Sequence, residues 1–144
     1  MTALTPYVIC KDAARAIDFY GRAFGATETM RLAEPSGKIG HAELTIEGAT
    51  LMLADEYPEH AARGPRTIGG SPVHLHLYVA DVDAVVARAV AAGATVRRPV
   101  ADQFYGDRSG TIEDPFGHVW KVGTKQEQLT PDEVERRYAK VMQG

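Results

Sequence analysis

The sequence lacks most features of secreted, membrane-spanning or nucleic-acid-binding chains. Cys10 is the only cysteine in 144 residues, which excludes an internal disulfide and a cysteine-rich zinc site. No apolar run reaches the roughly 18 residues that a membrane-spanning helix needs. The 19 acidic residues outnumber the 16 basic ones, and a net charge of −3 argues against a nucleic-acid partner. The first residues show no basic segment followed by an apolar one, so we expect a cytoplasmic protein without a membrane partner.

What the sequence does have is a repeat. Residues 8–12 (VICKD) and 77–81 (LYVAD) look alike, and each is followed by a helical run that ends in Gly-Ala. Asp12 and Asp81 are 69 positions apart. A second pair of similar segments, residues 47–53 and 116–122, contains Gly48 and Gly117, which are also 69 positions apart. A constant offset at low identity indicates two copies of one structural unit.

Each copy has the pattern of a strand, a helix and three further strands. In the first copy Asp12 can cap a helix with an apolar face, and Gly25 can end it. We therefore predict an α+β fold made of two tandem βαβββ modules in a single domain over residues 1–128. Module one spans 4–55, a linker rich in Pro, Gly and charge spans 56–72, and module two spans 73–124.

A helix is also predicted at the C-terminus, over residues 129–144. Thr130, Pro131 and Glu133 form a strong helix start. Val134, Tyr138 and Val141 then make an apolar stripe, which we expect to dock on the body of the protein or on a partner.

The sequence resembles the vicinal oxygen chelate superfamily, also called the glyoxalase, bleomycin-resistance and dioxygenase family. The residues that carry the resemblance are 16–26 (AIDFYGRAFGA), 79–83 (VADVD) and 114–120 (DPFGHVW). Residues 40–44 (GHAEL) and 102–108 (DQFYGDR) are similar to the PhnB-like branch. The resemblance covers about residues 4–124 and implies paired modules that form a cup-shaped mixed sheet, usually in a homodimer. It is specific for the fold and weak for the reaction.

Metal-using members of the family place one ligand on the first strand and one on the last strand of each module. Mapped onto this sequence, the resemblance puts these four ligands at Thr5, Met52, His74 and Lys121. Only His74 is a group that a divalent metal would choose, and a protonated Lys121 would repel a cation. The favoured interpretation is therefore a site without a metal cofactor.

A displaced metal site is the alternative. If Glu47-Gly48 is a two-residue turn, the residue numbers of two paired positions on the flanking strands add up to 95, so Glu43 pairs with Met52. His41, two residues before Glu43, points to the same face of the sheet. Together with His74 and His76, these two residues could bind Fe, Mn, Zn or Ni.

Most candidate site residues have a structural reading as well as a functional one. Glu43 could be a general base, or it could only pair with Lys121 or Arg108. Lys121 could bind an anionic group of a ligand, and Tyr7 and Tyr78 could form walls for a planar one. Tyr105, Asp107 and Arg108 are expected in a loop, where Arg108 could hold a carboxylate. The candidate ligand-binding residues are Tyr7, His41, Met52, His74, His76, Tyr78, Tyr105, Arg108 and Lys121.

Other residues are expected to be structural. His60 and His118 should face solvent, Cys10 should be a buried inert thiol, and Trp120 should point away from the site into helix packing.

Three functions follow from these interpretations. The first is a protein that binds a small organic molecule in the cup of the sheet, and an anion is one such molecule. The second is a metal-dependent lyase, isomerase or dioxygenase, and the third is a non-catalytic dimeric interaction protein. Closure of the cup within one chain and closure between two chains are both compatible with the sequence.

Overall fold

The structure, a computed structural model, describes residues 2–144 and has two four-stranded sheets. Module one contains β1 (Tyr7–Cys10), α1 (Ala13–Phe24), β2 (Thr27–Ala33), β3 (Ile39–Ile46) and β4 (Ala49–Asp55). Module two contains β5 (His74–Tyr78), α3 (Val82–Ala91), β6 (Thr95–Asp102), β7 (Asp107–Glu113) and β8 (Val119–Lys125). The strand orders β1-β4-β3-β2 and β5-β8-β7-β6 are equivalent, which confirms the predicted α+β fold of two βαβββ modules.

The repeat extends to the way in which each helix begins. Asp12 and Asp81 cap α1 and α3 through the backbone N–H groups of Arg15 and Ala84, each at 3.2 Å. Asp55 accepts from the Ala13 N–H, and Thr124 accepts from the Val82 N–H. Asp55 and Thr124 are again 69 positions apart, so the two copies keep the same support for the first turn of the helix.

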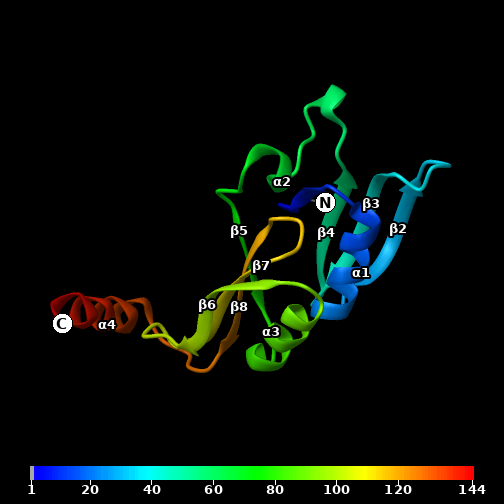
Figure 1. The fold of residues 1–144 in the computed structure, drawn as a ribbon. Helices are drawn as coiled ribbons and strands as arrows, with labels where there is room; N and C mark the ends of the chain where they lie inside the picture. The colour runs from blue at the N-terminus through cyan, green and yellow to red at the C-terminus, as the bar shows by residue number, and fades with distance from the viewer. Residues whose placement is uncertain (1) are drawn as a thin grey trace.

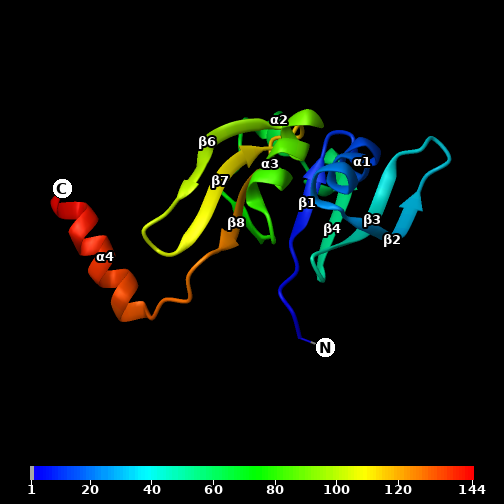
Figure 2. The same cartoon turned by 90° about the horizontal axis from the view of Figure 1, so that it is seen from below.

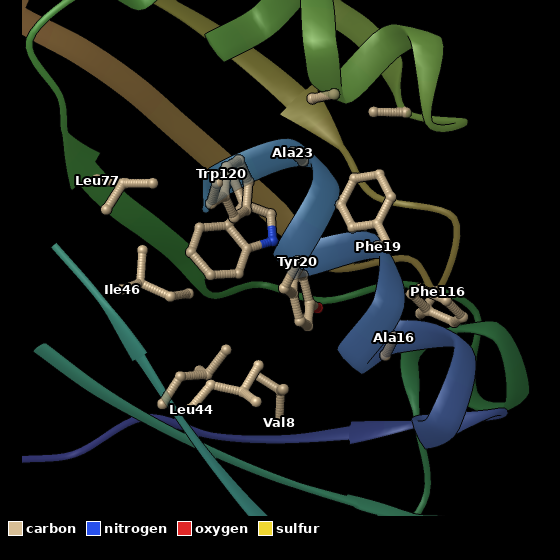
Figure 3. Close-up of a cluster of buried hydrophobic side chains, with 14 of the residues drawn as sticks. Val8, Ala16, Phe19, Tyr20, Ala23, Leu44, Ile46, Leu77, Phe116 and Trp120 are labelled. Carbon is tan, nitrogen blue, oxygen red and sulfur yellow. The ribbon is translucent and has the colours of Figure 1, made fainter. Parts of the chain in front are cut away.

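The two modules share one core, which lies under the helices. Figure 3 shows Tyr20 of α1 next to Trp120 of β8, with Leu77 of β5 and Ile46 of β3 on the other side of the indole. The Trp120 ring lies 5.4 Å from that of Tyr20 and 4.7 Å from that of Phe24, which confirms its predicted direction. The helices α1 and α3 also pack against each other. Each sheet therefore has a face covered by helices and an open face (Figure 1).

The linker and the C-terminal segment add three helical pieces. Residues 56–73 contain a short 3₁₀ helix η1 (Pro58–His60) and α2 (Pro65–Ile68). The C-terminal helix α4 (Pro131–Gln143) is capped by Thr130 as predicted. It projects away from both sheets and buries none of its residues (Figure 2). The docking on the body that the structure shows consists of contacts of Tyr138 with the Phe104 ring and of Arg137 with Glu127 and with the Phe104 carbonyl oxygen.

One buried carboxylate joins the modules. Asp114, which is 0% exposed, accepts hydrogen bonds from the Tyr20 hydroxyl at 2.6 Å and from Trp120 Nε1 at 3.0 Å. It also accepts from the backbone N–H groups of Phe116 and His118 in its own turn. Burial, followed by the charge of Asp114, raises the pKa of Tyr20 well above its ordinary value, so the phenol remains a donor.

We predict that Asp114→Ala lowers the free energy of unfolding by about 3–5 kcal/mol, because buried donors of Tyr20 and Trp120 lose their acceptor. Urea unfolding measures the change. Asp18→Ala is the control, since Asp18 forms an exposed ion pair with Arg22 at 3.1 Å whose loss costs less than about 0.5 kcal/mol. Equal effects of the two substitutions would contradict a central role for Asp114.

Candidate functional site

With the exception of Arg108, which points to α3, the candidate site residues lie on the open side of the two sheets. The strand register there forms two equivalent rows across the strands. In sheet one the strand register aligns Tyr7, Met52, Glu43 and Met30. In sheet two it aligns His76, Lys121, Thr111 and Arg98. Glu43 pairs with Met52, as the predicted turn required, and Glu47 and Gly48 both have positive φ in that turn. The first row has a carboxylate between methionines, whereas the second is rich in basic groups.

The open face of sheet one carries a chain of three polar side chains. The Tyr7 hydroxyl lies 2.8 Å from His41 Nδ1, and His41 Nε2 lies 2.9 Å from Glu43 Oε2. Partial burial, followed by the charge of Glu43, raises the pKa of Tyr7. Glu43 thus pairs with His41 and not with Lys121 or Arg108, which corrects the expected structural partners.

The open face of sheet two carries a cluster of aromatic rings and lysines. The His76 ring stacks on that of Tyr78 at 4.5 Å, and the Tyr78 hydroxyl donates to Asp107 at 2.8 Å. Partial burial and this hydrogen bond raise the pKa of Tyr78 to about 12. Lys121 Nζ lies 4.7 Å from the centre of the Tyr105 ring. The rings and the lysines thus contact one another on this face.

Lys121 has no carboxylate partner in the part of the chain that the structure describes. The ten ion pairs formed there all use other cations. Its charge instead contributes to the pKa of His76, which burial lowers most and Lys121 lowers further. His76 is therefore a neutral ring beside a cation at neutral pH.

A small apolar cavity lies between the edge of sheet two and module one. Its volume is about 130 Å³, and its lining residues are Pro6, Ile46, Ala49, Thr50, Leu51, Leu75, His76, Leu77 and Trp120. A cavity of about 150 Å³ is large enough for a benzene ring, so this one approaches that size. His76 belongs both to the cavity and to the polar row that includes Lys121.

The residues present do not fit the metal site that the family resemblance implies. Met52 pairs with Tyr7, so an ion there would meet a thioether and a phenol, and Lys121 pairs with His76, so an ion there would meet a cation. Thr5 precedes β1, and His74 is exposed at the start of β5. For the displaced alternative, the structure brings His41 to Glu43 but leaves His74 and His76 on the other sheet. Residues 2–144 contain no group of three or more His, Cys, Asp or Glu side chains arranged to hold a metal.

Several expectations about single residues need correction. Asp107 and Arg108 do not lie in a loop, because β7 begins at Asp107. Arg108 binds both oxygens of Asp83 and also Asp102, so its guanidinium is already paired within the chain.

His118 was expected to face solvent but is half-buried, with Nε2 2.8 Å from the Ile9 carbonyl oxygen. His60 is exposed, and Cys10 is buried as expected. Burial raises the pKa of the Cys10 thiol well above its ordinary value, which keeps it protonated and unreactive.

Sequence reasoning missed Lys125 and Ser109 on the open face of sheet two. Lys125 Nζ lies 5.5 Å from the centre of the Tyr78 ring, and Ser109 Oγ lies 3.2 Å from the Tyr105 hydroxyl. The signal was the period of two in β7 and β8, because Lys125 follows Lys121 by four residues and so shares its face.

Comparison with known proteins identifies the family. The model of the Glyoxalase/Bleomycin resistance protein/Dioxygenase superfamily matches residues 3–122, and the chain belongs to this family. An uncharacterised protein of Mycobacterium bovis is 46% identical over 136 residues, which cover 92% of this chain and 90% of the relative.

Solved structures of the family have the same fold. TioX from Micromonospora sp. ML1 is 26% identical with a TM-score of 0.67, over 87% of this chain and 99% of that one. The PhnB protein of Bacillus cereus is 18% identical with a TM-score of 0.68, over 85% and 99% of the two chains. The second likeness shows the fold alone. No helix of the described residues is long and apolar enough to cross a membrane.

We predict that the pKa of His76 lies below its ordinary value and rises in Lys121→Met, without returning fully because burial remains. Titration of the ring protons by NMR measures both values. Between the folded and unfolded pKa values the folded chain binds fewer protons at His76, so the free energy of unfolding increases with pH there and falls as pH drops. Lys38→Met should leave the titration unchanged, and a His76 pKa unaffected by Lys121→Met would contradict the coupling.

Proposed function

We propose that the protein binds a small organic anion on the open face of sheet two without a metal cofactor. The observation that carries this proposal is Lys121, a partly buried cation among aromatic rings with no carboxylate partner in residues 2–144. Buried or half-buried charges in proteins are usually paired, so an unpaired one favours a ligand of opposite charge. A lysine that formed an ion pair within the chain would not need such a ligand.

The surroundings of Lys121 favour an aromatic ligand. Tyr78 and Tyr105 place aromatic rings beside Lys121 and His76, and neutral His76 can donate one hydrogen bond and accept another. The 130 Å³ cavity beside His76 approaches the size that a single ring needs. His76 lines this cavity and pairs with Lys121 in the strand register, so a ring in the cavity that carries a carboxylate or phosphonate would have the lysine on the neighbouring strand.

We also propose that the protein is a homodimer. Strands β1 and β5 each pair with one neighbour only and leave a free edge, and the open faces are not covered within the chain. Tyr138 of α4 is 51% exposed, and Val141 is exposed as well. A second copy would cover such surfaces and would allow the row that contains Glu43 to face the row that contains Lys121.

A metal-dependent lyase, isomerase or dioxygenase stays a prediction, as does a non-catalytic interaction protein. Within one chain His41 and Glu43 supply only two adjacent ligand groups. A metal site would therefore need a third ligand from a second chain.

The ligand proposal is tested with benzoate and phenylphosphonate as anionic probes and benzamide as the uncharged one. We expect calorimetry to show tighter binding of the anions, and Lys121→Met to weaken it by about tenfold or more, the effect of one charge-assisted hydrogen bond. Lys38→Met is the matched control, because Lys38 Nζ also lies over a tyrosine ring, 3.9 Å from the centre of Tyr57. Equal binding of benzamide and benzoate would refute an anion site.

The dimer is tested by light scattering of the full chain at tens of micromolar. We expect the mass of two chains, and Tyr138→Glu should lower the association constant if α4 takes part. A single-chain mass across the whole concentration range would contradict the homodimer.

Metal content is tested by elemental analysis of untagged protein before and after treatment with EDTA. We expect substoichiometric metal and unchanged benzoate binding after EDTA. Stoichiometric metal that is lost in Glu43→Gln would instead support the metal-dependent enzyme.

A further inference from the structure

The open face of sheet one carries a hydrogen-bonded chain that the anion site does not use. Tyr7 lies on β1, and His41 and Glu43 lie two residues apart on β3. The two contacts, at 2.8 Å and 2.9 Å, run in sequence from the phenol through both ring nitrogens to the carboxylate. Tyr7 is 47% exposed, whereas the His41 and Glu43 side chains are each 24% exposed. The phenol is therefore the outer end of the chain.

The direction of the protons follows from the groups themselves. A carboxylate only accepts, so His41 Nε2 donates to Glu43. In a neutral imidazole the other nitrogen is then an acceptor, and His41 Nδ1 accepts the hydroxyl proton of Tyr7. The pKa of Tyr7 is raised, so the resting group is a phenol that loses its proton only when the imidazole takes it.

We propose that Tyr7, His41 and Glu43 form a proton relay in which the Tyr7 oxygen is the general base toward an acidic C–H bond of a bound small molecule. This inference rests on the proposed small-molecule function. The logic is that of a hydroxyl activated by an imidazole that a carboxylate orients. His41 cannot meet the molecule directly because both of its nitrogens are engaged.

The proton transfer balances within these groups. The proton of the C–H bond moves to the Tyr7 oxygen while the Tyr7 proton moves to His41 Nδ1. The electron pair of the broken bond stays on the substrate and is delocalised into its electron-withdrawing group. The resulting imidazolium is stabilised by the Glu43 carboxylate, and the reverse transfers return the proton to the substrate or its product.

The neighbours of Glu43 favour this role. Met52 and Met30 flank it in the strand register, so apolar side chains border the carboxylate on both sides. A medium of low polarity strengthens the attraction between the carboxylate and an imidazolium. The backbone carbonyl of Glu43 also accepts from the Thr29 hydroxyl at 3.2 Å, which ties this part of β3 to β2.

The test uses 5-nitrobenzisoxazole, an uncharged probe with one acidic C–H bond. A base removes that proton, the electron pair forms a C≡N bond, the N–O bond breaks, and a coloured phenolate is released. We expect the full chain to give a saturable rate above buffer. Tyr7→Phe should lower kcat by about 100-fold, the effect of a positioned general base. Glu43→Gln should lower kcat with little change in KM, because Glu43 does not touch the probe.

The chain supplies a matched control pair. Tyr57 of the linker donates its hydroxyl to Glu34 of module one, with no histidine between them. Tyr57→Phe and Glu34→Gln should leave the rate unchanged. Circular dichroism and thermal unfolding check that each variant is folded. We expect Tyr7→Phe to fold, because it removes only a hydroxyl from a half-exposed side chain.

Three outcomes would overturn the relay. They are a wild-type rate equal to that of buffer, an unchanged rate in Tyr7→Phe, and loss of activity in Glu43→Gln alone, which would make the carboxylate itself the base. Ring ¹⁵N shifts of His41 give an independent check, since the relay requires a protonated Nε2. Because the probe is uncharged, the two proposals fail separately. Turnover of the probe without binding of benzoate would refute only the anion site, and binding of benzoate without turnover of the probe would refute only the relay.

Discussion

The buried carboxylate of Asp114 is the interaction on which the arrangement of the two modules depends. It lies in the turn between β7 and β8 and accepts from Tyr20 of α1, so one side chain connects module two to the helix of module one. A buried charge is tolerated only when donors surround it, and the four donors here come from a turn, an indole and a phenol. This requirement fixes Trp120 on the covered face of sheet two. The alternation of β8 then places Lys121 on the open face.

Much of this could be predicted from the sequence because it depends on local pattern and on strand register. The constant offset of 69 gave the two modules, and a two-residue turn at Glu47-Gly48 gave the pairing of Glu43 with Met52. Alternation also predicted that Tyr7 and Tyr78 share open faces and that Trp120 does not. These features follow from backbone geometry, which one sequence specifies well.

The partners of the polar side chains could not be predicted in the same way. Pairing of Glu43 with His41 depends on two rotamers on one strand, and periodicity alone does not distinguish it from pairing with Lys121 or Arg108. Arg108 was expected in a loop, where it could hold a carboxylate of a ligand or pair with Glu43. Instead β7 starts at Asp107 and places Arg108 beside Asp83 of α3. The partial burial of His118 could not be predicted either, because its hydrogen-bond acceptor, the Ile9 carbonyl oxygen, is 109 positions away in sequence.

The two open faces have diverged in chemistry although they occupy equivalent positions of a repeat. Tyr7 corresponds to His76, and Met52 corresponds to Lys121, at the same offset of 69. One copy thus holds a carboxylate behind an imidazole and a phenol, and the other holds a lysine among aromatic rings. A lysine beside a metal quartet would weaken metal binding, but a lysine beside an anion that loses a proton would stabilise the added negative charge. The residues that fit a metal poorly are therefore the same ones that would suit acid–base chemistry on an anionic molecule held between the two kinds of face.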